Sequence, residues 1–452
     1  MKSSAIGRAL RCIGFLLLVS AAALATAKDD RQPVLSLSAQ AVAAMTGLTP
    51  GKASVTVQQK TNASPWRFHA IRLQSGEQTL SDDPEGHLAK RRFLISERGA
   101  QQIALAFEAD GGFAFGFLDD ENGLQRLIGD ETSGGGLRFS AVAIEQQPVN
   151  CEADRVEHAA LRSLKLPQTA ASRLVAKGGV PGHEAKVAIE VDFAMMSGHF
   201  GNSTANALSW LQQMFLATNL YYQRDLALQL VMATPVIYNT STDPYCTTGN
   251  PCSPLGPHLM FQFGDYWRNN HSGIDRDFAA LISGRLTGGN PTGISWTNQY
   301  CKNGFDTGTP WGTKTAGSYG VNLYVPGASV SGGAAAELFG HELGHSLGAE
   351  HNNCTDTNPG MGGLQPIDQC SNSANSLGAA CWGGSLACPV SGSGLIMSTG
   401  CADIAGCSLN RQRVFHPVQI DLLTGNIASN TPSCLSTTIL PGTDVLYYDG
   451  FE

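Results

Sequence analysis

The segment His341–His351, HELGHSLGAEH, holds histidines at spacings that suit metal binding. Residues four apart on a helix lie one turn from each other on the same face, so the imidazoles of His341 and His345 can reach one ion. Gly348 can adopt a left-handed conformation that ends the helix and turns His351 towards the same ion. Three imidazoles leave one position of a tetrahedral zinc ion open, which is the arrangement of a catalytic zinc site.

Glu342 follows the first of these histidines and is not needed as a ligand. Held over a water on the ion, its carboxylate can act as the general base while the metal polarises the carbonyl to be attacked. This chemistry hydrolyses a peptide bond without a covalent intermediate. The alternative is a helix whose histidines are structural, and HExxH alone recurs by accident. With the glycine and third histidine added, a chance match is on the order of 10⁻⁵ to 10⁻⁴ from ordinary residue frequencies.

The first 27 residues have the pattern of a secretory signal peptide. Lys2, Arg8 and Arg11 precede an apolar run that ends near the small residues Ala25-Thr26-Ala27. The run is short for a membrane span, and we therefore expect it to be removed on export. The sequence predicts a secreted protein, extracellular or periplasmic, with no membrane span.

Composition and cysteine usage agree with an exported, folded protein. The chain carries 29 basic and 37 acidic residues, a net charge of −8, which argues against binding to nucleic acid. Of its 12 cysteines, ten follow residue 240. In an oxidising compartment an even set of this kind predicts disulfides around the loops, with a pairing that the sequence does not define. The ten are Cys246, Cys252, Cys301, Cys354, Cys370, Cys381, Cys388, Cys401, Cys407 and Cys434.

Residues 28–184 have the pattern of a β-rich propeptide. Alternating segments at 92–96, 102–107, 112–117 and 137–144 predict strands, and none carries a catalytic constellation. The stretch 165–184, with its prolines and glycines, predicts an exposed linker where maturation could cut the chain.

Cys151 is the one cysteine between the signal segment and residue 240. A thiolate is a strong zinc ligand, so Cys151 in the open position would displace water and keep the site latent. A buried free thiol and a disulfide are the alternatives.

The remaining chain predicts an α/β domain at 185–430, followed by a tail at 431–452. A strand at 186–193, an amphipathic helix at about 204–222 and a strand at 226–238 make a right-handed crossover. A helix is expected at 275–286, strands at 292–296 and 319–325, and a short helix at 415–423. The fold class is α/β, with a twisted, mostly parallel sheet and the zinc helix packed against it.

Three further elements bear on substrate binding. Gly293, Ile294, Ser295 and Trp296 are candidates for an edge strand that pairs with an extended peptide, although an ordinary internal strand is the alternative. His416, before Pro417, either lines the cleft or begins a helix. Residues 352–394 show no periodicity and must be held by disulfides.

HELGHSLGAEH followed by Gly394-Leu395-Ile396-Met397-Ser398 resembles the metzincin zinc peptidases, and most of all the reprolysin or adamalysin-like group with the ADAM-type catalytic domain. The resemblance covers roughly residues 185–430 and suggests a secreted microbial form. It implies that His341, His345 and His351 bind one catalytic zinc and that Glu342 is the general base. It further implies that Met397 is the methionine of the turn beneath the histidines.

Two residues depart from related patterns. Asn352 stands where many adamalysins have Asp, and Thr399 stands where astacins have a tyrosine ligand. The expected function is a secreted zinc endopeptidase, made as a latent zymogen, that acts as a monomer on protein or peptide substrates. The alternatives are a catalytically silent zinc-binding module and a metzincin of another subfamily. Asp and Asn are frequent in the loops but form no spaced calcium motif, so calcium is not indicated.

Overall fold

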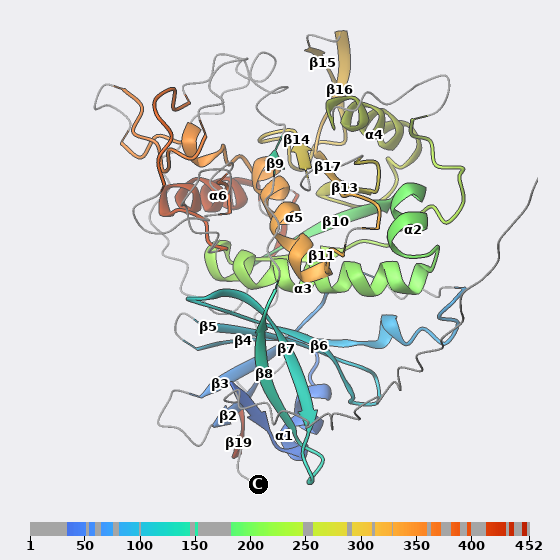
Figure 1. The fold of residues 1–452 in the computed structure, drawn as a ribbon, viewed down its shortest axis with the longest axis vertical. Coiled ribbons are helices and arrows are strands. Elements are labelled where there is room, and N and C mark those ends of the chain that lie inside the picture. The colour runs from blue at the N-terminus through green and yellow to red at the C-terminus, as the bar shows by residue number, and fades with distance from the viewer. Residues whose placement is uncertain are drawn as a thin grey trace, which may run out of the picture. The chain divides into compact units, whose positions relative to one another are not determined.

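The computed structural model describes most of the chain after residue 33 (Figure 1). The described residues lie in one compact unit, residues 33–452. The expected signal segment, 1–27, and residues 165–181 of the expected linker lie outside the described residues. The described ranges are 34–50, 54–58, 65–75, 81–98, 101–144, 150–151, 182–246, 256–286, 292–309, 312–327, 329–358, 363–371, 381–388, 396–398, 413–430, 434–437 and 445–449.

Nine of the described strands form an N-terminal sheet, in the order β1, β8, β7, β6, β5, β4, β3, β2, β19. Neighbours from β1 to β2 along this order are antiparallel. The last strand, β19, comes from the C-terminal tail and pairs in parallel with β2. The strands are β1 (Leu35–Leu37), β2 (Ser54–Gln58), β3 (Trp66–Ile71), β4 (Arg92–Arg98), β5 (Gln101–Phe107), β6 (Phe113–Asp120), β7 (Gly123–Glu131), β8 (Leu137–Ala143) and β19 (Val445–Asp449).

The second sheet has the described strands in the order β11, β10, β13, β17, β14, β9. Strand β10 is parallel to β11 and β13, and β13 is parallel to β17, whereas β14 is antiparallel to β17. Two short strands, β12 and β18, pair with β10. The strands are β9 (Asn150–Cys151), β10 (His183–Val191), β11 (Leu228–Met232), β12 (Val236–Ile237), β13 (Phe278–Ser283), β14 (Thr292–Ser295), β17 (Tyr319–Leu323) and β18 (Ser436–Thr437).

Helices cover both faces of the second sheet. Helices α3 (Thr204–Leu226) and α5 (Gly332–Leu347) share one apolar core with strands β10 and β13. On the opposite face, α4 (Gly256–Asn270) packs on β13, β14 and β17. The other helices are α1 (Ala39–Thr46), α2 (Phe193–His199), α6 (Pro417–Asn430) and the 3-10 turns η1 (Leu88–Lys90) and η4 (Asn352–Cys354), and a hairpin joins β15 (Phe305–Thr309) to β16 (Gly312–Ala316).

Helix α3 begins and ends on local signals. The side chain of Ser203 accepts a hydrogen bond from the backbone N–H of Asn206, which caps the first turn. Ala227 adopts a left-handed conformation with φ of 49° and ends the helix. This helix is four residues longer than the expected 204–222, so the strand expected from residue 226 begins at Leu228.

The helix expected at 275–286 is wrong. This segment holds β13, at the centre of the second sheet. Its apolar run is buried on every residue, and a short run of this kind fits a buried strand as well as it fits a helix. Helix α4, upstream of it, was not predicted.

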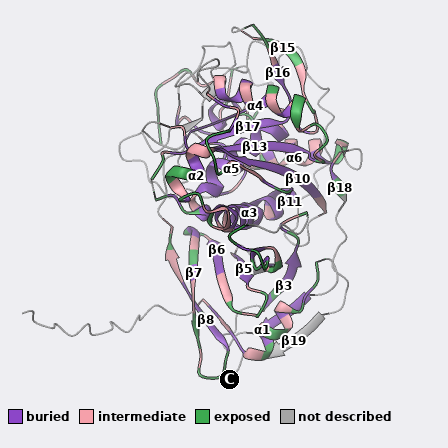
Figure 2. Cartoon of the chain, turned by 90° about the vertical axis from the view of Figure 1, so that its right-hand side faces the viewer, coloured by how far each residue is buried: buried purple, intermediate pink, exposed green. Residues whose placement is uncertain are grey.

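The N-terminal sheet packs on α3 (Figure 2), and α3 is buried along most of its length. Phe115 and Phe117 of β6 belong to the same apolar cluster as Leu211 and Phe215 of α3. Phe117 also reaches α5, because a Cβ added at Gly333 would lie 2.5 Å from its Cε1. The two sheets therefore share one continuous core through α3.

Buried charges join the same elements. The guanidinium of Arg224 on α3 donates to Oδ2 of Asp119 on β6 at 2.6 Å and to Oδ1 of Asp225 at 2.7 Å. Asp225 also accepts a hydrogen bond from the backbone N–H of Phe415. Burial alone lowers the pKa of Arg224, but the two carboxylates outweigh it and raise that pKa, so the guanidinium stays charged.

None of the described helices has the length and apolar character that crossing a membrane requires.

Candidate metal centre and active site

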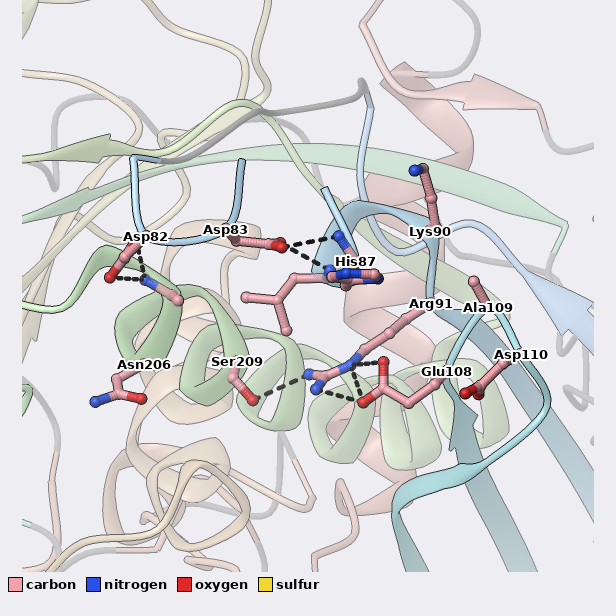
Figure 3. A pocket seen from close by; sticks show the side chains of 12 residues that line it. Asp82, Asp83, His87, Lys90, Arg91, Glu108, Ala109, Asp110, Asn206 and Ser209 are labelled. Atoms are coloured by element: carbon pink, nitrogen blue, oxygen red, sulfur yellow. Dashed lines mark hydrogen bonds and ion pairs between the residues drawn. The ribbon is translucent and has the colours of Figure 1, made fainter. Parts of the chain in front are cut away.

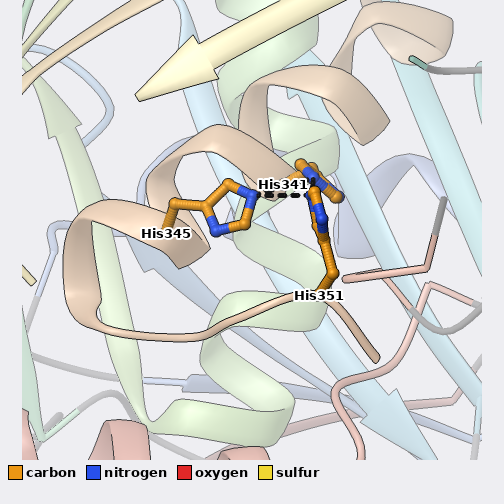
Figure 4. A group of neighbouring side chains, drawn as sticks. All are labelled: His341, His345 and His351. Carbon is orange, nitrogen blue, oxygen red and sulfur yellow. Dashed lines mark hydrogen bonds between the residues drawn. The ribbon is translucent and has the colours of Figure 1, made fainter. Parts of the chain in front are cut away.

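The three histidines of HELGHSLGAEH converge at the end of α5 (Figure 4). Ser331 caps the start of the helix, and its side chain accepts a hydrogen bond from the backbone N–H of Ala334. His341 and His345 lie one turn apart on it. Gly348 has φ of 115°, a conformation that costs little only without a Cβ, and its N–H bonds to the carbonyls of Gly344 and His345. The chain leaves the helix at this glycine and returns with His351.

The imidazole nitrogens are arranged as metal ligands. Nε2 of His345 lies 3.1 Å from Nε2 of both His341 and His351, and the third distance is 3.3 Å. A tetrahedral zinc with bonds of about 2.0 to 2.1 Å needs nitrogens about 3.3 to 3.4 Å apart. All three side chains are at most 2% exposed. The nitrogen positions therefore fit one small ion.

Hydrogen bonds to carbonyls fix the tautomers of two of these rings. Nδ1 of His341 lies 2.7 Å from the carbonyl oxygen of Ile396, and Nδ1 of His345 lies 2.8 Å from that of Ala349. A carbonyl oxygen can only accept, so each Nδ1 carries the proton and each Nε2 presents a lone pair to the ion. Bonds of this kind also orient the ligating rings.

Met397 packs against α5 at Gly344. A Cβ added at Gly344 would lie 2.6 Å from its sulfur atom, and the side chain is fully buried. The backbone of the same turn reaches two sides of the site, because Ile396 accepts from His341 and Met397 accepts from the N–H of Asn352 at 3.0 Å. The turn therefore supports both the helix and the return segment that carries His351.

Glu342 faces strand β14 at Gly293. A Cβ added at Gly293 would lie 2.1 Å from Oε1 of Glu342, so the carboxylate fills the space that a side chain would take. Glu342 is 2% exposed. Its charge also acts on two tyrosines: burial raises the pKa of both Tyr222 and Tyr324, and the negative charge of Glu342 raises it further.

Gly293→Ala tests this contact. The added methyl group must push the carboxylate or the strand aside, and we expect kcat for peptide hydrolysis to fall by about 100-fold, as for a misplacement near 1 Å. The matched control is Gly308→Ala on β15, where a Cβ meets nothing within 4 Å. Steady-state cleavage rates of the two variants give the comparison, and equal rates would contradict the contact.

Strand β14 contains three of the four predicted edge residues. Gly293 and Ser295 face α5, whereas the side chains of Ile294 and Trp296 belong to the cluster under α4. The edge of β14 that faces away from β17 is paired with β9 in parallel register. Asn150 lies opposite Thr292, and Cys151 lies opposite Gly293. The candidate latency residue is therefore next to the glycine that faces Glu342. Its side chain lies outside the described residues.

The described cysteines after residue 240 are all in disulfides. Cys301 pairs with Cys434 and Cys354 with Cys381, and Cys246, Cys370 and Cys388 are also disulfide-bonded. The second pair is close to the metal centre, since η4 follows His351 directly.

His416 lies just before α6, and its Nδ1 accepts a hydrogen bond from the backbone N–H of Val418 in the first turn. This contact fits the prediction that His416 begins a helix.

A cavity of about 720 Å³ lies between the N-terminal segment and α3, and it is separate from the group of three histidines (Figure 3). Some of its polar groups make contacts between these two parts. Asp82 accepts from Ser203 and from the N–H of Ala205, and Arg91 donates to Glu108 and to Ser209. Burial raises the pKa of Asp82, but the hydrogen bonds outweigh it and lower that pKa to about 2. The cavity is a contact region of α3, and His341, His345 and His351 are not among its lining residues.

Sequence reasoning missed residues that support α5. The hydroxyls of Tyr221 and Tyr222 on α3 donate to the carbonyls of Ala336 and Gly340 at 2.5 and 2.7 Å. Asn322, a polar residue within the apolar strand YGVNL, was also missed, and its isolation in that run was the available signal.

The three buried imidazoles beside a carboxylate could hold one metal ion. Residues 183–403 match the Reprolysin_5 family, described as metallo-peptidase family M12. This segment is a reprolysin-like metallopeptidase domain. A search of curated proteins found no match to the chain.

Proposed function

We propose that the protein is a secreted zinc endopeptidase of the metzincin type, made as a latent zymogen. The observation that carries this proposal is the convergence of three Nε2 atoms within 3.3 Å, next to a carboxylate that lies over Gly293 of strand β14. The disulfides fit an oxidising compartment outside the cytoplasm.

The residues of the chain divide the work between binding and proton transfer. His341, His345 and His351 would hold the ion, which when bound supplies Lewis-acid polarisation of the carbonyl and makes water easier to deprotonate. Glu342 accepts the proton of the attacking water and passes it to the leaving nitrogen. Both transfers need the carboxylate within hydrogen-bond reach of the scissile bond, and its contact with β14 keeps it there.

Strand β14 is the proposed binding edge for substrate. An extended peptide paired with its backbone would lie along the metal centre with little dependence on its side chains. In the uncut chain β9 takes this edge, with Cys151 opposite Gly293. This pairing supports latency, because a substrate cannot bind to backbone groups that β9 already uses. Whether the Cys151 thiolate also binds the ion is part of the proposal.

Zinc analysis and proteolysis test the proposal together. We expect one zinc per chain, and casein cleavage that appears after limited proteolysis between residues 151 and 185. A chelator should abolish the cleavage and added zinc should restore it. Zinc without cleavage by the trimmed chain would favour a silent zinc-binding module, and an absence of zinc would contradict both functions.

A further inference from the structure

The two faces of strand β17 have different neighbours. Tyr319, Val321 and Leu323 belong to the apolar cluster of α4. Tyr324 belongs to the cluster of α5, and its hydroxyl donates to the carbonyl of Ala335 on that helix. Because side chains alternate along a strand, Asn322 is on the α5 face with Tyr324.

Asn322 is also directly opposite the glycine that contacts the catalytic carboxylate. The register pairs Asn322 with Gly293. Opposed residues of an antiparallel pair have Cβ positions about 4.5 to 5.5 Å apart on the same face. The Cβ position of Gly293 is 2.1 Å from Oε1 of Glu342. The amide of Asn322 is therefore near this carboxylate, and because the two groups make no direct hydrogen bond, one water could join them.

The amide of Asn322 makes no hydrogen bond that would account for its burial. The residue is fully buried, and neither Nδ2 nor Oδ1 has a partner among the residues that the structure describes. Ser295, on the same face of β14, is 1% exposed, and its hydroxyl also has no hydrogen-bond partner among the described residues. Burying an unsatisfied amide costs about 1 to 3 kcal/mol, so Asn322 does not stabilise the fold as it stands.

We propose that Asn322 is a positioning residue for Glu342: its Nδ2–H donates a hydrogen bond to one water, which in turn donates to the Glu342 carboxylate and aims it at the scissile bond. This inference rests on the proposed peptidase function. The hydrogen bond satisfies the buried amide and limits the rotation of the carboxylate above Gly293. Ser295 can hold the bridging water from β14, where it neighbours Gly320 and lies diagonally from Asn322.

Asn322→Leu, made in the full chain and assayed after limited proteolysis in the linker, tests the positioning role. We expect kcat for casein or a peptide substrate to fall about ten- to 100-fold with KM unchanged. The zinc content should stay at one per chain. The thermal midpoint of the metal-free variant should equal or exceed that of the metal-free wild type, because a buried unsatisfied amide is replaced by an apolar group of similar size.

Two further variants separate positioning from structure. Asn322→Asp keeps the shape but removes the N–H donor, so it should lose kcat as Asn322→Leu does. Leu323→Met, a volume-conserving change on the other face of β17, should keep wild-type kcat. Unchanged kcat in Asn322→Leu would overturn the inference, as would wild-type kcat in Asn322→Asp or a loss of kcat that is matched by a lower midpoint.

The outcome also separates this inference from the function on which it rests. If the trimmed wild type cleaves nothing, the proposed peptidase function fails and the positioning role fails with it. If the wild type is active and Glu342→Gln is not, but Asn322→Leu retains full activity, the peptidase function stands and only the role of Asn322 is overturned.

Discussion

Glu342→Ala is expected to lower kcat for peptide hydrolysis by about 10²- to 10⁴-fold, the usual contribution of a general acid–base residue. The ion would keep its three imidazole ligands, so zinc content should remain at one per chain. The loss should appear in kcat more than in KM, because the carboxylate acts on the reacting water and leaving nitrogen and is not needed for the backbone pairing of substrate with β14.

Two variants sharpen this measurement. Glu342→Gln keeps the volume above Gly293 and removes the base, so it should be as inactive as the alanine variant. Glu350→Gln is the control, since this glutamate is in the same motif but is exposed. Rates within a few-fold of wild type for Glu342→Gln would contradict the assignment of the base, whatever the zinc content.

Arg224→Met should reduce the free energy of unfolding of the uncut chain by about 3 to 5 kcal/mol, the cost of breaking a buried ion pair. The guanidinium is the partner of two carboxylates, and the side chains of Asp119 and Asp225 are only 4% and 8% exposed. Without Arg224 both would be left buried beside each other. Burial raises the pKa of Asp119 in the intact protein, which shows how poorly its surroundings solvate a charge.

An exposed ion pair provides the control for this effect. Arg268 bonds to Asp306, and their side chains are 37% and 67% exposed. Arg268→Met should cost less than about 1 kcal/mol, because water solvates both charges. Urea unfolding of the two variants gives the comparison. Equal losses would mean that the burial of the Arg224 network does not determine its contribution.

The grouping of the three candidate ligands could be predicted from the sequence because their geometry is local. Two turns of one helix and a left-handed glycine place His341, His345 and His351 without help from distant segments. Helix α3 was predictable for a similar reason, since its apolar residues recur at helical spacing. The prediction was wrong for β13, where an apolar run without periodicity is equally compatible with strand and helix.

The surroundings of the site depend on pairings between distant residues. The sequence does not reveal the register of β14 with β17, which sets Asn322 opposite Gly293. It also does not reveal the register of β14 with β9, which sets Cys151 opposite the same glycine. The contact of Gly293 with Glu342 joins a strand to a helix some fifty residues later, and only the folded chain brings them together. Single residues such as Met397 were predicted through a family pattern, and not through their own spacing.

Strand β19 ties the end of the chain to its beginning. Val445–Asp449 pairs with Ser54–Gln58, so the N-terminal sheet includes a segment that follows the metallopeptidase domain. One cut in the linker would leave two fragments that still share this pairing, the core around α3 and the Arg224 ion pairs. Cleavage and departure of the N-terminal part would then be separate events. The delay between them would be governed by how often that part unfolds, which makes activation a question of kinetic stability.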